Sequence, residues 1–212
     1  MKKDVFGAQG DFITSPEISQ IFGELIGIWF YERWLHYGSP KHFKFVEFGP
    51  GRGTLISDIL RVFTKLGKIS NALHLHLVEI SPAMRAIQKK LLCTDSRYNI
   101  EKATDDETLR TKDGIPIIWH RHILDVPKGF TFYLAHEFFD ALPIHQFQKT
   151  ENGWREVMVD IDKDFNGPHH LKFCLAPSNT LATVLIPEDA KGEFLEIRPQ
   201  AQIIVKNMAE TI

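Results

Sequence analysis

The sequence has little cysteine, no excess of positive charge and no long hydrophobic run. Its two cysteines, Cys93 and Cys174, lie far apart and form no C-x-x-C pair, which argues against a disulfide framework and a structural zinc site. The formal net charge of −2 argues against a large electrostatic surface for nucleic acid. No hydrophobic run approaches the length that spans a bilayer. We therefore predict a globular chain without a metal site, a nucleic-acid partner or a membrane span.

The first residues of the sequence also show no recognisable targeting signal. The residues MKKDVFGAQGDF have neither the apolar core of a secretory signal nor the long Arg- and Ser-rich form of a transit peptide. Reduced thiols fit the cytosol or the mitochondrial matrix, and the residues alone do not choose between these compartments.

Hydrophobic periodicity predicts helices and strands in a single domain over residues 1–212. We expect an N-terminal helix at 15–37 with Ser15 as N-cap. Its apolar face comprises Ile18, Ile21, Phe22, Leu25, Ile26 and Trp29. A core at 43–143 follows, with strands at 43–48, 73–80, 115–122 and 130–138, one helix that closes on Gly67 and another capped by Ser81. Strands that alternate with helices predict an α/β fold with a parallel sheet.

The pattern changes after residue 143. Two extended runs flank Glu-Asn-Gly at 151–153, which is a hairpin signal. A further strand and a terminal helix are expected near the end of the chain. We expect residues 144–212 to add to the same sheet, and we expect the polar stretch at 104–114 to be a loop.

The stretch VEFGPGRGTL, residues 46–55, has the composition of a ligand-binding turn between a strand and a helix. Gly49 and Gly51 fit the dinucleotide fingerprint, but its third glycine position holds Thr54. Pro50 also removes one backbone N–H that a pyrophosphate would use. No Gly-Lys-Ser/Thr sequence follows, so this stretch is not a P-loop. The loop therefore favours a ligand without phosphate groups.

Two acids extend this interpretation. Glu47 precedes the glycine turn and could pair with the cationic end of an amino-acid-like ligand, while Glu79 ends the second strand, where a ribose diol is commonly bound. This pair of acids with a compact glycine turn indicates S-adenosylmethionine, which is cationic and carries no phosphate. The alternative is that the glycines serve only a tight strand-to-helix turn.

Four segments together resemble one family. Residues 10–29, 46–61, 78–88 and 136–147 are similar to the MidA-like methyltransferases, whose mitochondrial members are assembly factors of respiratory complex I. The resemblance implies a class I methyltransferase fold, a Rossmann-like α/β sheet with helices on both faces, here truncated at the C-terminus. It also implies protein arginine methylation in the mitochondrial matrix, with a core subunit of complex I as the substrate.

The resemblance assigns residues as well as a fold. Glu47, Gly49, Gly51 and Gly53 match the cofactor loop, and Glu79 matches the ribose-binding acid. The chain departs from the family where His136 replaces the usual Asn and where Arg198 replaces a small residue.

The segment HEFFDALP follows the fourth expected strand and supplies the candidate catalytic acids. Carboxylates can hold a guanidinium by paired hydrogen bonds and draw its charge away from the attacking nitrogen. Glu137 and Asp140 are three residues apart and share a face only if the segment turns helically. Asp140 could instead be a helix N-cap, and Glu137 a charge at the end of a strand.

Two further residues are candidates for cofactor contacts. Asp125 follows the third strand and is expected to accept a hydrogen bond from the adenine amino group, although a loop acid without a role is the plain alternative. Ser15 lies in a segment that could cover the cofactor, or it could simply start a helix.

The main prediction is thus an S-adenosylmethionine-dependent protein arginine methyltransferase. A non-catalytic assembly module with the same fold is the first rival. An NAD-dependent oxidoreductase is the second, and Pro50 and Thr54 argue against it. The sequence does not predict an oligomeric state.

Overall fold

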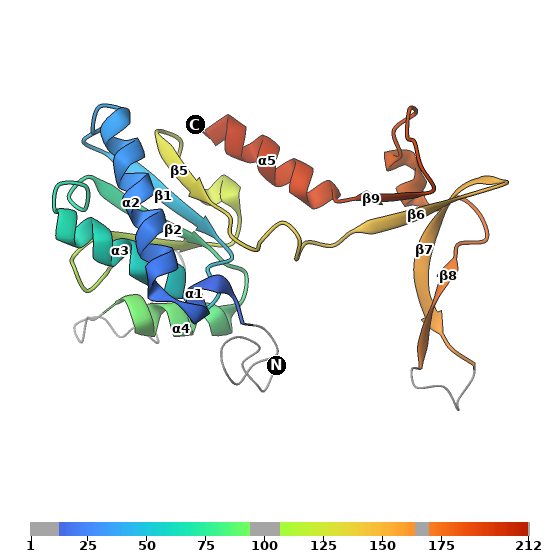
Figure 1. Cartoon of the computed structure of the whole chain (residues 1–212), viewed down its shortest axis with the longest axis horizontal. Helices are drawn as coiled ribbons and strands as arrows, with labels where there is room; N and C mark the ends of the chain where they lie inside the picture. The colour runs from blue at the N-terminus through green and yellow to red at the C-terminus, as the bar shows by residue number, and fades with distance from the viewer. Residues whose placement is uncertain (1–12, 94–106, 164–169, 212) are drawn as a thin grey trace. The chain divides into compact units, whose positions relative to one another are not determined.

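The computed structural model describes residues 13–93, 107–163 and 170–211. The chain divides into two compact units, one comprising Met1–Phe138 with Asn207–Ile212 and the other comprising Phe139–Lys206. Figure 1 shows the elements of each unit, which we describe in turn.

The first unit is built on a five-stranded sheet with the order β3-β4-β2-β1-β5. Four strands run parallel, and β3 is an antiparallel edge strand of two residues. The strands are β1 (Phe43–Phe48), β2 (Leu73–Val78), β3 (Leu109–Arg110), β4 (Pro116–His120) and β5 (Thr131–Leu134). The parallel sheet predicted from the alternating pattern is confirmed. Because β2 and β5 flank β1 on opposite sides, the order of the strands reverses at β1, where open α/β sheets bind ligands.

Helices cover one face of this sheet. The helix α3 (Thr54–Leu66) follows β1 and ends at Gly67, and α4 (Pro82–Leu92) follows β2 with Ser81 as its N-cap, both as predicted. The core between helices and sheet is formed by alternate strand residues that share one face, among them Phe45, Leu75 and Trp119. A second helical layer on the opposite face stays a prediction.

The N-terminal helix is divided into two. Ser19 has extended backbone angles (φ −151°, ψ 125°) and separates α1 (Ser15–Ile18) from α2 (Gln20–His36). The Ser19 hydroxyl accepts a hydrogen bond from the backbone N–H of Ile21 and so caps α2. This cap starts a new helix at Gln20, and residues 15–36 therefore do not form one continuous helix. The prediction that Ser15 is an N-cap is wrong, because Thr14 holds that position and Ser15 is the first helical residue.

The predicted apolar face of α2 is also largely wrong. Ile21 and Trp29 are 64% and 56% exposed, whereas Gly23 and Gly27 are buried against α3. A Cβ at Gly23 would lie 2.6 Å from the Cβ of Asp58. Two glycines of α2 thus allow it to approach α3 closely. Phe22 and Ile26 do pack against the core, so this part of the predicted face is confirmed.

The second unit contains a separate antiparallel sheet with the order β8-β7-β6-β9. The strands are β6 (His145–Thr150), β7 (Gly153–Ile161), β8 (Leu171–Leu175) and β9 (Phe194–Ile197). The helix α5 (Pro199–Thr211) follows, and its residues from Asn207 on are counted with the first unit. A short 3-10 helix, η2 (Leu181–Leu185), lies between β8 and β9.

The hairpin predicted around residues 151–153 is confirmed, as are the late strand and the terminal helix. The prediction that residues 144–212 add to the first sheet is wrong. A hairpin link of two residues makes β6 and β7 antiparallel neighbours, and β8 and β9 pair with them in turn. The loop expected at 104–114 lies partly outside the described residues, and its described part contains β3.

Candidate functional site

The glycine loop after β1 has a backbone that only glycine adopts easily. Gly49, Gly51 and Gly53 have φ angles of 56°, 53° and 88°. A Cβ at Gly49 would come within 2.9 Å of the Phe138 ring, whereas nothing lies within 4 Å of a Cβ position at Gly51. Gly53 is the N-cap of α3. All three positions therefore require glycine for their backbone conformation, and Gly51 also faces open space.

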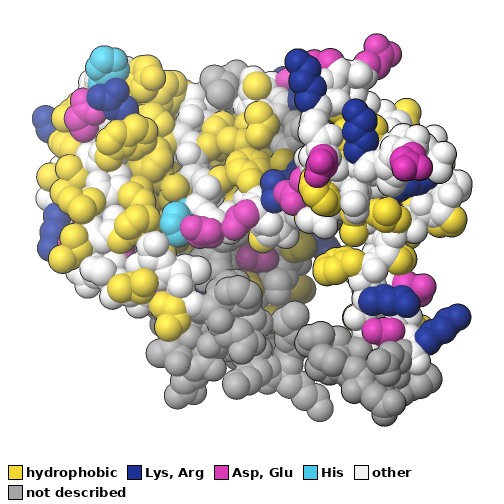
Figure 2. Space-filling model, turned by 45° about the vertical axis from the view of Figure 1, so that its right-hand side comes forward, with side chains coloured by type: hydrophobic (Ala, Val, Ile, Leu, Met, Phe, Trp, Pro, Cys, Tyr) yellow, Lys and Arg dark blue, Asp and Glu magenta, His cyan; other side chains and the backbone are white. Residues whose placement is uncertain are grey.

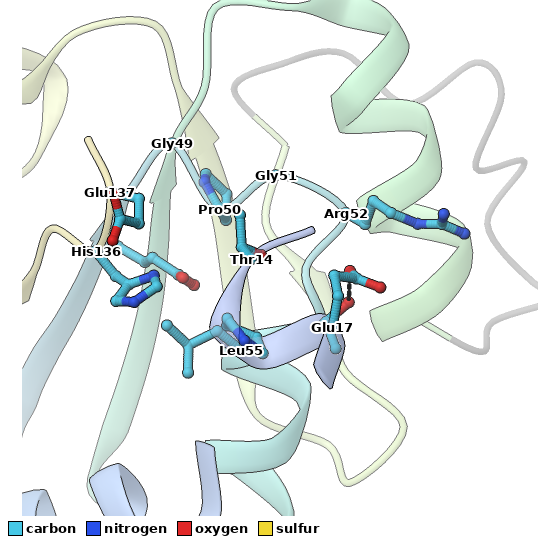
Figure 3. Close-up of a pocket in the computed structure, with 12 residues that line it drawn as sticks. Thr14, Glu17, Gly49, Pro50, Gly51, Arg52, Leu55, His136 and Glu137 are labelled. Carbon is cyan, nitrogen blue, oxygen red and sulfur yellow. Dashed lines mark hydrogen bonds between the residues drawn. The ribbon is translucent and has the colours of Figure 1, made fainter. Parts of the chain in front are cut away.

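A pocket opens beside this loop at the switch point of the sheet. Its wall contains the segment after β1, the start of α1 and α3, and the segment after β5 (Figure 3). The lining residues are Thr14, Pro16, Glu17, Glu47, Gly49, Pro50, Gly51, Arg52, Thr54, Leu55, His136 and Glu137. His136 and Glu137 lie on one side of the hollow and Thr14 on the other, while the Arg52 side chain points away from them. All of these residues belong to the first unit.

Glu47 is the chemically distinctive residue of the pocket. It is the second-last residue of β1 and is only 3% exposed, and its Oε2 atom has no hydrogen-bond partner among the described residues. Burial away from water raises the pKa of this carboxyl to about 8. A buried acid without a partner is costly, and a cationic ligand group would both satisfy it and favour its ionised form.

Glu79 lies after the end of the neighbouring strand β2, and its side chain is buried. Its Oε1 accepts a hydrogen bond from the backbone N–H of Ser81 at 2.8 Å, and its Oε2 accepts one from Gln88 at 3.4 Å. Glu79 does not line the pocket itself. The same Gln88 nitrogen also donates to the carbonyl of Gly51 at 2.7 Å, so the glycine turn and the Glu79 carboxylate meet at one side chain.

Glu137 has an unusual backbone for a residue with a side chain. Its φ angle is 49°, in the left-handed region that favours glycine. Such residues cost free energy and persist where the surrounding structure holds them, often at functional sites. The Glu137 side chain is exposed at the pocket wall.

Asp140 is exposed and belongs to the second unit. The segment from residue 135 to residue 139 is not helical, so the condition under which Glu137 and Asp140 would share a helical face is not met. The helical turn that would place residues three apart on one face is not formed here. Their joint catalytic role stays a prediction.

Three other candidates lie outside the lining of the pocket. Gly53 shapes the start of α3, and Ser15 is half-buried in the first turn of α1. Asp125 is exposed in the 3-10 helix η1 (Ile123–Asp125), where its Oδ2 accepts a hydrogen bond from the backbone N–H of His122. The roles predicted for these residues toward a cofactor remain predictions.

The structure adds residues to which the sequence pattern gave no role. Glu17 lines the pocket, and its Oε1 accepts a hydrogen bond of 2.7 Å from the Thr54 hydroxyl, which ties α1 to the start of α3. His136 also lines the pocket and contacts the ring of Phe22. The available signal was the position of these residues inside the segments that carry the family resemblance.

The described ranges contain no group of three or more His, Cys, Asp and Glu side chains arranged to hold a metal ion. None of the helices in the described part of the chain combines the length and hydrophobicity needed to cross a membrane.

A parallel sheet with a glycine turn and a pocket at its switch point defines a Rossmann-like α/β protein, a class that binds ligands at this edge. A family model described as "Putative S-adenosyl-L-methionine-dependent methyltransferase" matches residues 25–212, and the chain belongs to this family. The family resemblance seen in the sequence is thereby confirmed.

The chain is also similar to curated proteins. It is 49% identical over 215 residues to the Homo sapiens protein named "Protein arginine methyltransferase NDUFAF7, mitochondrial", and 45% identical over 218 residues to the Xenopus tropicalis protein of the same name. These matches cover 99% and 100% of this chain but 48% and 50% of the two relatives. The chain therefore spans about half the length of the curated relatives it matches.

A solved structure shows the same fold. A crystal structure from Burkholderia thailandensis, of a protein bound to S-adenosyl-homocysteine, superimposes with a TM-score of 0.67 and 22% sequence identity. The match covers 98% of this chain and 49% of that chain. The predicted α/β methyltransferase fold is confirmed by this likeness and by the family match.

Proposed function

We propose that this protein is a protein arginine methyltransferase that uses S-adenosylmethionine, works in the mitochondrial matrix and modifies a core subunit of respiratory complex I during assembly. The names of the relatives, which describe mitochondrial protein arginine methyltransferases, support the reaction and the compartment. The resemblance to the MidA-like family supports the substrate and the matrix. The family of the chain supports the cofactor.

One observation of the structure carries the cofactor part of this proposal. The Glu47 carboxyl is buried at the pocket, and one of its oxygens has no partner among the described residues. The amino group of S-adenosylmethionine is a cation of the kind that such a carboxyl would bind, since a charge-assisted hydrogen bond stabilises both partners. Gly51 leaves open space in which the ligand can approach the backbone.

The remaining candidate residues have proposed roles toward the ribose and adenine of the cofactor, in covering it, and in shaping the loop. Glu79 would accept hydrogen bonds from the ribose hydroxyls with the lone pairs that Ser81 and Gln88 leave free. Asp125 would accept from the adenine amino group, and the segment that contains Ser15 would cover the bound cofactor. Gly49 and Gly53 give the loop the curvature that the ligand needs.

The reaction requires alignment of the two reactants and removal of one proton. When bound, the cofactor would supply a methyl group on a sulfonium, whose sulfur would leave as a neutral thioether without help from an acid. The guanidinium nitrogen that gains the methyl group would lose one proton, to water or to the Glu137 carboxylate, which is exposed at the pocket wall. The protein must align an arginine nitrogen with that methyl group and must localise the charge of the guanidinium, which is a poor nucleophile. The carboxylate of Glu137, which lines the pocket, is proposed to hold the guanidinium, and the role expected for Asp140 stays a prediction.

Calorimetry with S-adenosylmethionine tests the cofactor part of the proposal. We expect the wild-type chain to bind, and Glu47→Gln to bind about 10- to 100-fold more weakly, because a charged hydrogen bond contributes about 1.5–3 kcal/mol. Glu32→Gln is the matched control, since Glu32 is an exposed acid on α2 that pairs with Arg33. Binding of NAD instead of S-adenosylmethionine would contradict the proposal.

A non-catalytic assembly module remains a second candidate. It is favoured by the absence of a helical turn that would bring Glu137 and Asp140 onto one face. Transfer of a radiolabelled methyl group to complex I core subunits separates the two functions. Labelling that Glu137→Gln abolishes supports the enzyme, and cofactor binding without any labelling supports the module.

A further inference from the structure

Gln88 is a completely buried polar residue on α4, and its side-chain amide joins three parts of the first unit. Its nitrogen donates to the Gly51 carbonyl at 2.7 Å and to the Glu79 Oε2 at 3.4 Å. Its oxygen accepts a hydrogen bond of 2.8 Å from the indole nitrogen of Trp119 on β4. The amide thus contacts the glycine loop after β1, the acid after β2 and the core face of β4.

The orientation of this amide is fixed by chemistry. An indole N–H can only donate a hydrogen bond, so the Gln88 atom that faces Trp119 must be the oxygen. The NH2 group therefore faces Gly51 and Glu79, which are both acceptors. Both N–H groups and the oxygen have partners, and rotating the amide by 180° would lose all three hydrogen bonds at once.

This contact holds the glycine loop together with backbone hydrogen bonds from Gly49 to Val78 and from Gly53 to Pro50. Nothing lies within 4 Å of a Cβ position at Gly51, so side-chain packing does not hold the loop on that side. The Gln88 side chain also packs near Gly53, where a Cβ would lie 3.6 Å from its Cγ. Gln88 therefore supports both the carbonyl of the turn and the start of α3.

We propose that Gln88 is a positioning residue for the cofactor site, which holds the Gly51 turn and the Glu79 carboxylate at a fixed separation. This separation would fit a ligand whose amino-acid end lies at the Gly51 turn and whose ribose diol lies at Glu79. This inference rests on the proposed cofactor. Gln88 itself touches no reacting atom and acts through Gly51 and Glu79.

Replacement of the amide tests the inference. Gln88→Met keeps the length of the side chain and removes its donors and its acceptor. We expect the variant to bind S-adenosylhomocysteine at least about tenfold more weakly, because the Glu79 Oε2 atom and the Gly51 carbonyl lose the hydrogen bonds that Gln88 donates. Gln20→Met is the matched control: Gln20 is an exposed glutamine on α2 that donates to Glu24, and its replacement should leave affinity unchanged.

A second variant covers the case in which Gln88→Met folds poorly. Trp119→Phe keeps an aromatic ring in the core but removes the N–H that orients the amide, so we expect an affinity loss of about two- to fivefold. Thermal melting of each variant shows whether it is folded at the temperature of the binding measurement.

A double-mutant cycle separates positioning from plain structural support. If Gln88 acts through Glu79, the combined loss of affinity in Glu79→Gln with Gln88→Met will be smaller than the sum of the single losses. Additive losses, or folded Gln88→Met and Trp119→Phe variants with wild-type affinity, would overturn the inference. A wild-type chain that binds no S-adenosylhomocysteine would instead contradict the proposed cofactor.

Discussion

The two units of the chain bury their hydrophobic residues to very different extents. In the first unit, three helices pack on a parallel sheet, and the large side chains of the central strands are almost completely buried. In the described part of the second unit, only Phe147, Ala176 and Ile197 are buried hydrophobic residues. The same alternation of apolar residues thus leads to a core in one unit and to an exposed surface in the other.

The exposed surface of the second unit is one face of β7 and β8. Three cross-strand pairs lie on it, Val157–Leu175, Val159–Phe173 and Ile161–Leu171, and all six residues are apolar. Most of these side chains are well exposed, and hydrophobic side chains are abundant on the surface shown in Figure 2. A strand pattern therefore predicts which residues share a face, whereas burial requires a second layer that packs on that face.

The largest expected effect contrasts one phenylalanine from each unit. Phe45 is completely buried against Phe30 and Phe63, so Phe45→Ala should lower the free energy of unfolding by about 3–5 kcal/mol. Phe173 on β8 is 76% exposed, and Phe173→Ala should change it by less than about 0.5 kcal/mol. Urea unfolding followed by circular dichroism measures both. Equal losses would mean that the β7–β8 face is covered in solution.

The next effect concerns a buried acid and its dependence on pH. Burial raises the pKa of Glu47 to about 8, so the folded chain holds this proton more tightly than the unfolded chain. Stability from this group is therefore greatest below about pH 4.5 and declines as pH rises to about 8. We expect a decline of about 2–4 kcal/mol in wild type, since water entry reduces the full value of the shift.

The pH experiment compares variants in the two units. Glu47→Gln should remove that decline, which is measured from the free energy of unfolding between pH 5 and pH 9. Glu151→Gln, at an exposed position in the turn between β6 and β7, serves as the control and should keep the wild-type slope. A Glu47→Gln variant with an unchanged slope would show that Glu47 is hydrated.

The smallest effect contrasts two glycines with similar backbones. Gly51 and Gly153 both have positive φ, and nothing lies within 4 Å of a Cβ position at either. Replacement of each by alanine should cost about 1–2 kcal/mol from the left-handed backbone alone. Only Gly51→Ala should weaken binding of S-adenosylhomocysteine, by about tenfold, because its methyl group enters the space proposed for the ligand. Equal affinities in calorimetry would place the ligand away from Gly51.

Local signals in the sequence were enough to predict much of the first unit. The strand at 43–48 was predicted with its observed bounds because glycines and prolines delimit it, and Ser81 and Gly67 marked the helix ends correctly. The hairpin at 151–153 also follows from its turn residues. These features depend on a few neighbouring residues, which is why a single sequence contains them.

Features that depend on distant contacts were not predictable in the same way. The exposed side of α2 resulted from the close approach of Gly23 and Gly27 to α3, which no helical periodicity reveals. The separate second sheet depended on which strands pair, and the residue pattern of a single strand does not indicate its neighbour in the sheet. Within the site, Glu47 and Gly49 were predicted to lie together and do, whereas Gln88 was missed because its partners are 37 and 31 residues away.

The donor-only character of the Trp119 indole has an evolutionary consequence. Glutamate has a carboxylate oxygen where glutamine has its NH2 group. At position 88 it would therefore direct negative charge at the Gly51 carbonyl and at Glu79. Substitutions at positions 88 and 119 should therefore be correlated among homologues: where the indole is lost, selection on the amide's orientation is relaxed, and where it is kept, position 88 should tolerate little change.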